Sequence, residues 1–133
     1  MAALEHKKIL VVEDDAHISE GLNLNLSLQG YDVCIASDGI VALDEWRQWH
    51  PDLIVLDIML PGIDGYEVCE ILRLNPLYRD IKIIFLTAKG REVEIAKGLA
   101  LGADAYITKP FSNAEIVAKV KELLESSHEK AGT

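Results

Sequence analysis

Four short apolar runs in this sequence each stop at a residue that can bind metal or phosphate. Runs 9–12, 53–56, 83–86 and 105–108 lead into Glu13-Asp14-Asp15, Asp57, Thr87 and Lys109-Pro110, respectively. If the runs are parallel buried strands, their carboxyl ends meet at one edge of a sheet, where open α/β folds build their sites. That edge then gathers carboxylates, a hydroxyl and an ammonium, which are the groups that phosphoryl transfer to a carboxylate uses.

The carboxylates of Glu13, Asp14 and Asp57 predict a magnesium site. Like charges in a partly desolvated site need a positive partner, and Mg2+ prefers oxygen ligands while it retains several waters. We expect Asp14 and Asp57 to bind the ion directly, the backbone carbonyl of Met59 to add a ligand, and Glu13 to act through water. Mn2+ is the other candidate ion.

Asp57 is the predicted nucleophile, because carboxylates can attack phosphorus to form an aspartyl phosphate. The phosphoryl oxygens would be neutralised by the cation, the Lys109 ammonium and the Thr87 hydroxyl. Without phosphate, Lys109 is expected to pair with Asp57. Each residue alone is more often a helix cap, a β-forming residue or a solvated cation, so the inference rests on their joint occurrence in this order.

The elements that would position these residues alternate regularly along the chain. We predict strands at 8–12, 31–36, 53–57, 81–86 and 105–108, and helices at 16–29, 39–49, 65–74, 91–101 and 113–125. This alternation predicts an α/β fold, a parallel sheet with helices on both faces. The length of 133 residues fits one domain, placed at 7–125, with flexible termini at 1–6 and 126–133.

The first predicted helix carries a conflicting signal. Leucines at 22, 24, 26 and 28 alternate with polar residues, which is a strand pattern. Ile18, Leu22 and Leu26 nevertheless fall on adjacent helical turns. Asp14 or Asp15 can cap the start, and Gly30 supplies a stop, so we predict a helix.

The composition excludes several classes of protein. A net charge of −9 argues against nonspecific binding to nucleic acid or to an anionic membrane. No apolar stretch is long enough to span a membrane and no apolar signal region is present, so we expect a cytoplasmic protein. Cys34 and Cys69 lie within or beside apolar runs and are expected to be free thiols that pack as small hydrophobes.

Four segments resemble one known family. They are ILVVEDD at 9–15, LIVLDIMLPGIDGYE at 53–67, FLTA at 85–88 and GADAYITKPF at 102–111. Over roughly residues 7–125 the chain is similar to the response-regulator receiver domains of two-component signalling. The resemblance implies a flavodoxin-like, doubly wound sheet of five strands in the order 2-1-3-4-5, with five helices.

The resemblance also implies a function. Asp57 would accept a phosphoryl group from a sensor histidine kinase or a phosphotransfer protein, with Mg2+ bound. Thr87 and Tyr106 would form a switch pair, and the Lys109–Pro110 peptide bond would be cis. Such a domain is a signalling switch rather than an enzyme, since it catalyses only its own phosphorylation and dephosphorylation.

Partner surfaces follow from the same resemblance. Kinase docking would involve Ile18, Leu22 and Phe111, and the face around Tyr106 would act on an output domain or target protein. A phosphorylation-dependent homodimer is one expectation, although Ala105 stands where dimerising members often carry Asp. The chain is either a stand-alone receiver or the N-terminal receiver of a longer regulator.

Two other classes were weighed. A phosphohydrolase of the haloacid-dehalogenase type needs another Asp two positions after its nucleophile as a general acid, where this chain has Met59. A flavodoxin-like nucleotide or flavin binder needs a Gly/Ser/Thr-rich loop after the first strand, whereas Glu13-Asp14-Asp15 would repel phosphate unless metal intervened. The sequence therefore lacks a residue or loop that each of these two alternative classes requires.

Overall fold

The computed structural model describes residues 7–132 apart from 79 and 89–91, and it describes only the backbone of 92–95 and 126–132. Residues 1–6 and 133 lie outside the described residues, so the prediction that they are flexible stays a prediction. The first residue of the helix predicted at 91–101 also lies outside.

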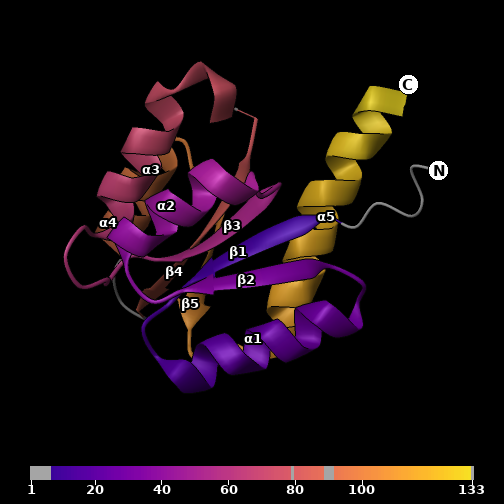
Figure 1. Ribbon diagram of the computed structural model, residues 1–133, viewed down its shortest axis with the longest axis horizontal. Coiled ribbons are helices and arrows are strands. Elements are labelled where there is room, and N and C mark those ends of the chain that lie inside the picture. The colour runs from indigo at the N-terminus through magenta and orange to yellow at the C-terminus, as the bar shows by residue number, and fades with distance from the viewer. Residues whose placement is uncertain (1–6, 79, 89–91, 133) are drawn as a thin grey trace.

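Five parallel strands form one sheet (Figure 1). They are β1 (Lys8–Val12), β2 (Asp32–Ala36), β3 (Leu53–Asp57), β4 (Lys82–Ala88) and β5 (Ala105–Lys109). Their order in the sheet is β2-β1-β3-β4-β5, which confirms the predicted order. β4 is longer than predicted, and it therefore includes Thr87 as a strand residue.

Helices cover both faces of the sheet. Figure 1 shows α1 (Ala16–Leu28) and α5 (Asn113–Gly132) on one face, and α2 (Gly39–Trp49), α3 (Gly65–Leu74) and α4 (Glu92–Ala100) on the other. A short 3-10 helix, η2 (Pro76–Tyr78), follows α3. The backbone of α5 continues past the predicted end at 125. Within the described part of the chain, no helix combines the length and apolarity needed to cross a bilayer.

Alternate strand residues build two separate cores. In β1, Leu10 and Val12 pack with α2 and α3, whereas Ile9 and Val11 pack with α1 and α5. Because successive side chains of a strand point to opposite faces, a strand covered on both faces reads as an unbroken apolar run. This explains why the strands of this chain lack the alternation of half-exposed sheets.

The leucine alternation in the first helix has a simple structural reading. Leu22 and Leu26 are fully buried, whereas Leu24 and Leu28 are 61% and 72% exposed. The segment is helical, as predicted, because only every fourth residue needs to reach the core. Gly30 ends it with a positive φ of 95°, a conformation that favours glycine.

Side-chain caps fix the ends of the helices at the carboxyl edge of the sheet. Asp15, Asp38 and Asp64 accept hydrogen bonds from the first backbone N–H groups of α1, α2 and α3, respectively. At the start of α5, Ser112 Oγ accepts from Glu115 N–H, and Glu115 Oε1 accepts from Ser112 N–H. This reciprocal pair is a capping box, worth about 1 kcal/mol in helix stability. The loops that carry the site are therefore anchored.

Both cysteines are free thiols. Cys69, a residue of α3, is fully buried, and Cys34 is half-buried with its Sγ 3.5 Å from Glu45 Oε2. Burial raises the pKa of both thiols, and the Glu45 charge raises that of Cys34 further. A raised pKa makes a thiol less reactive, which agrees with the predicted packing role.

Candidate functional site

Three carboxylates meet where β1 and β3 end. Val12 pairs with Leu56 in the sheet, so Glu13 and Asp14, which follow β1, lie beside Asp57 at the end of β3. One oxygen from each of the three carboxylates lies within 4.8 Å of the others. Glu13 and Asp57 are only 2% and 3% exposed, whereas Asp14 is exposed. The predicted acidic cluster is thus assembled at the carboxyl edge of the sheet.

Lys109, the last residue of β5, extends into this cluster. Its Nζ donates a hydrogen bond to Asp57 Oδ2 at 3.0 Å and lies 3.0 Å from Glu13 Oε1. The Glu13 contact is an ion pair by distance, without the alignment of a hydrogen bond. Burial alone lowers the pKa of Lys109, but the pairing with Glu13 and Asp57 outweighs it and raises that pKa. The ammonium therefore stays charged and offsets part of the carboxylate repulsion.

Glu13 is the most perturbed acid of the cluster. Its pKa is raised from 4.5 to about 7, mainly by burial and also by the proximity and charge of Asp57. Lys109 and the backbone N–H of Asp15, 3.1 Å from Glu13 Oε2, oppose the rise. The site therefore holds more negative charge than its own cation balances, which is the condition for binding a further cation.

This pKa predicts how stability depends on pH when no divalent cation is bound. Unfolded Glu13 releases its proton near 4.5 and folded Glu13 near 7, so its contribution to stability is complete below 4.5 and is lost as pH rises through about 7. Between about pH 5 and about pH 8 the free energy of unfolding should fall by roughly 2 kcal/mol more in the wild type than in Glu13→Gln. Urea unfolding in a chelator measures this difference. Equal falls in the two proteins would show that Glu13 does not hold the proton.

The donor set of this cluster fits a hard divalent cation. Its three carboxylates are the only such group of acidic, His or Cys side chains among the described residues. Carboxylate oxygens suit Mg2+ or Mn2+, and the exposed Asp14 leaves one side open for retained waters. The acidic pocket could hold a metal at the positions that the sequence indicates.

The loop after Asp57 approaches the strand closely. Met59 N–H donates to Asp57 Oδ1 at 3.0 Å, which orients the carboxylate. A Cβ on Gly65 would lie 2.6 Å from Asp57 O and 2.8 Å from Ile58 Cα, so only glycine lets α3 begin against the end of β3. Gly65 directly follows the Asp64 cap of α3, and this position is the sequence signal for the close approach. The Lys109–Pro110 peptide bond is cis.

Thr87 presents a buried hydroxyl without a partner. Thr87 is 2% exposed near the end of β4, and its Oγ1 has no hydrogen bond to any residue that the structure describes. A buried unpaired hydroxyl costs about 1–3 kcal/mol, so an acceptor arriving at this point would be favoured. Tyr106, on the neighbouring strand β5 and in register with Phe85, is 43% exposed. The two predicted switch residues thus lie on adjacent strands, one buried and one turned outward.

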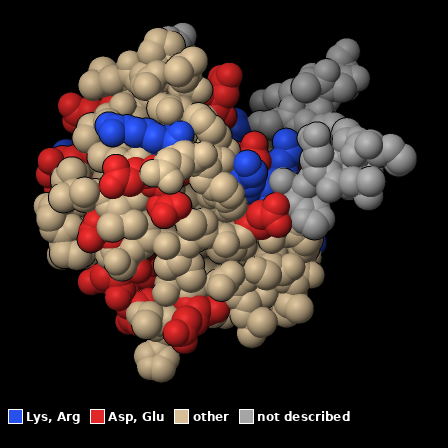
Figure 2. Space-filling model, in the orientation of Figure 1, with Lys and Arg blue, Asp and Glu red and all other residues tan. Residues whose placement is uncertain are grey.

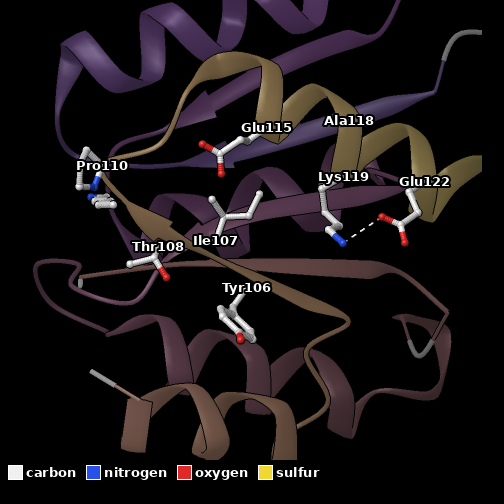
Figure 3. Close-up of a pocket in the computed structure, with 9 residues that line it drawn as sticks. Tyr106, Ile107, Thr108, Pro110, Glu115, Ala118, Lys119 and Glu122 are labelled. Atoms are coloured by element: carbon white, nitrogen blue, oxygen red, sulfur yellow. Dashed lines mark hydrogen bonds and ion pairs between the residues drawn. The ribbon is translucent and has the colours of Figure 1, made fainter. Parts of the chain in front are cut away.

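Tyr106 lies at a groove between β5 and α5 of about 800 Å³. Figure 3 shows Ile107 on the α5 side of β5, Tyr106 on the other side of the strand, and the side chains of Glu115, Lys119 and Glu122 along α5. Lys119 Nζ pairs with Glu122 Oε2 at 2.9 Å. The groove therefore combines an exposed aromatic ring with a neutralised charge pair.

A second hollow, of about 480 Å³, lies between the start of α1 and the loop after Lys109. Ile18 and Phe111, two of the residues expected to contact a kinase, line it. The third, Leu22, is fully buried in the core, so the expectation that Leu22 makes a surface contact is wrong. The helical period turns Leu22 inward.

The topology and the position of the site define a doubly wound α/β protein of the flavodoxin-like type, with its chemistry at the carboxyl ends of β1, β3, β4 and β5. Residues 9–121 match the family described as "Response regulator receiver domain". The chain belongs to this family.

Individual relatives agree. The chain is 52% identical over 122 residues to the alkaline phosphatase synthesis transcriptional regulatory protein PhoP of Bacillus subtilis (strain 168), covering 92% of this chain and 50% of that protein. It therefore spans about half the length of this curated relative. The receiver domain of the Francisella response regulator 1452 has 33% identity and a TM-score of 0.84, covering 92% of this chain and 99% of that one. The chemotaxis response regulator CheY4 of Vibrio cholerae has 27% identity and a TM-score of 0.85, covering 90% and 99%.

Family membership defines the type of protein. Receiver domains of two-component response regulators are phosphorylated on an aspartate and regulate an output, and they act as signalling switches rather than as classical enzymes. In this family, receiver domains work with histidine kinases and outputs, and they generally use Mg2+.

Proposed function

We propose that Asp57 is the phosphoacceptor of this receiver. The observation that carries the proposal is that one buried carboxylate contacts both the Lys109 ammonium and the Met59 N–H, beside two further acids. A carboxylate oxygen of Asp57 attacks the phosphorus of a phosphohistidine on a sensor kinase or phosphotransfer protein. The P–N bond breaks, the proton-accepting imidazole leaves, and Asp57 becomes a mixed anhydride.

The chain's other site residues have defined parts in this transfer. Asp14, Asp57 and the Met59 carbonyl would hold Mg2+ or Mn2+, with Glu13 acting through water, and the ion when bound would supply neutralisation of phosphoryl charge. Lys109 moves from a bare carboxylate to a phosphoryl oxygen, and Thr87 donates its free hydroxyl to another. These are positioning and charge-neutralising roles, which dominate phosphoryl transfer. In this way the domain catalyses its own phosphorylation and dephosphorylation.

Phosphorylation changes the conformation through Thr87 and Tyr106. The unpartnered Thr87 hydroxyl gains an acceptor when the phosphoryl group arrives, and its movement opens space towards β5. Tyr106 turns inward to fill that space, which alters the groove beside α5. This is a shift between two packings of one fold rather than a new fold.

The partners follow from the two hollows. A phosphodonor protein docks near Ile18 and Phe111, next to the acidic cluster. An output domain or target protein, or a second copy in a phosphorylation-dependent homodimer, binds the face around Tyr106. Neither role requires nucleic-acid or membrane binding by this domain, which covers residues 7–125 and works in the cytoplasm.

A test of the switch uses beryllofluoride with Mg2+ as a stable phosphoryl mimic. We expect the NMR signals of Tyr106 and of α5 to shift in the wild type. In Thr87→Ala the mimic should still bind, because the ligands and Lys109 remain, but the Tyr106 shift should be largely lost. A full Tyr106 response in Thr87→Ala would contradict the proposed switch.

A further inference from the structure

A small cavity lies between α2 and α3, far from the acidic cluster. Its volume is about 60 Å³, and it is lined by Leu43, Trp46, Arg47, Ile71, Leu72, Asn75 and Tyr78. The lining residues come from the C-terminal halves of α2 and α3 and from the segment through η2. Helices in this fold start at the carboxyl edge of the sheet, so the cavity lies towards the opposite edge.

Hydrogen-bond donors of this cavity lack partners. Trp46 is 1% exposed, and its indole Nε1–H donates to no residue that the structure describes. A buried indole N–H usually finds an acceptor. The side-chain oxygen of Asn75 accepts a hydrogen bond from Leu77 N–H, so the side-chain nitrogen of Asn75 is left as a second donor for the cavity. The cavity therefore offers donors without the acceptor that they need.

Arg47 is an exposed residue of α2, and its side chain lines the cavity with a positive charge. Within the described part of the chain its guanidinium makes no ion pair or hydrogen bond, although the protein has 22 Asp and Glu residues. Among the acids whose side chains the structure describes, none lines the cavity. Figure 2 shows the face that carries α2 and α3, where Lys and Arg are sparse and acidic side chains are more widely scattered. A free arginine beside unpartnered donors is complementary to an anion.

The remaining walls are apolar. Leu43, Ile71 and Leu72 line the cavity, and Trp46 and Tyr78 meet edge to face with ring centroids 5.0 Å apart. One water-sized group needs about 15 Å³, so a volume of 60 Å³ has room for about four such groups. The occupant that fits has an anionic end with two acceptor oxygens and a very short hydrocarbon end.

We propose that this cavity binds a small monocarboxylate of the size of acetate. The carboxylate accepts hydrogen bonds from Arg47, Trp46 Nε1–H and the Asn75 amide, and the alkyl end contacts Leu43, Ile71 and Leu72. Binding requires neither Mg2+ nor phosphorylation, so the site is independent of the function proposed for Asp57.

The two tryptophans provide the test. Trp46 lines the cavity, whereas Trp49 does not, so their indole N–H signals in a 1H–15N NMR spectrum serve as probe and internal reference. Titration with sodium acetate against sodium chloride should shift the Trp46 signal saturably, with a Kd on the order of 1 mM because so small a ligand makes few contacts. Acetamide, the neutral isostere, should bind about tenfold more weakly.

Variants separate the possible outcomes. Arg47→Gln should weaken acetate binding about tenfold, while Lys7→Gln, which removes an exposed positive charge outside the cavity, and Asp57→Asn should leave it unchanged. Equal movement of both indole signals, equal affinity for acetate and acetamide, or wild-type affinity in Arg47→Gln would each overturn the proposal. A cavity that holds only ordered water, with no saturable acetate response, would overturn it as well.

Discussion

Asp57→Asn should lose all labelling by acetyl phosphate in the presence of Mg2+. The amide of asparagine has nearly the shape of the carboxylate but no nucleophilic oxygen anion, so no mixed anhydride can form. The variant should remain folded, because the substitution removes one of the buried negative charges that lie within 4.8 Å of one another. Intact-mass spectrometry measures the fraction of phosphorylated protein directly.

Two other aspartates serve as controls for this prediction. Asp44→Asn, on the exposed face of α2, changes the same chemical group away from the site and should label like the wild type. Asp14→Asn keeps the proposed acceptor but removes a proposed metal ligand, so labelling should be slower and need more Mg2+. Unchanged labelling of Asp57→Asn would place the nucleophile elsewhere.

Removal of the Lys109 charge should lower the stability of the protein substantially. In Lys109→Met the aliphatic stem stays, but Glu13 and Asp57 each lose a cation at 3.0 Å. In a chelator at about pH 8 the free energy of unfolding should fall by roughly 3 kcal/mol, since breaking a buried ion pair leaves carboxylates uncompensated. At about pH 5 the loss should be smaller, because Glu13 then carries a proton. Urea unfolding at the two pH values gives both numbers.

Mg2+ should compensate for this loss. In Lys109→Met the Mg2+ ion no longer competes with the ammonium, so Mg2+ should raise the Tm of the variant by more than it raises the Tm of the wild type. The response of the Tyr106 NMR signal to beryllofluoride should be weaker in the variant. Lys119→Met is the matched control, because the Lys119–Glu122 pair is on the surface and is worth at most about 1 kcal/mol. A Lys109→Met protein as stable as the wild type without metal would contradict the charge balance derived for the site.

The sequence predicted the fold and the position of the site well, for an identifiable physical reason. Strands buried on both faces are unbroken apolar runs, and the residues that end them must meet at one edge of the sheet. The cluster of Glu13, Asp14, Asp57 and Lys109 therefore follows from four local patterns. The helix that contains Leu24 and Leu28 was harder to predict, because the identity of a leucine does not indicate whether its side chain is buried or exposed.

Features that depend on long-range packing were not predictable. That Lys109 contacts Glu13 as well as Asp57 depends on how far a flexible side chain reaches across three strands. Similarly, the Arg73 guanidinium donates hydrogen bonds to Gly102 O and Ile81 O and pairs with Asp104, which ties α3 to the end of α4. The cavity at Trp46 and Arg47 arises from imperfect packing between two helices, and no local sequence pattern reports such a gap.

The most direct test of the central claim is the identity of the residue that carries the phosphoryl group. After phosphorylation with acetyl phosphate and Mg2+, borohydride reduction converts an aspartyl phosphate into homoserine, which peptide mass spectrometry can locate. We predict homoserine at position 57 and at no other aspartate. Homoserine at position 14, or an unreduced phosphate on another side chain, would contradict the account.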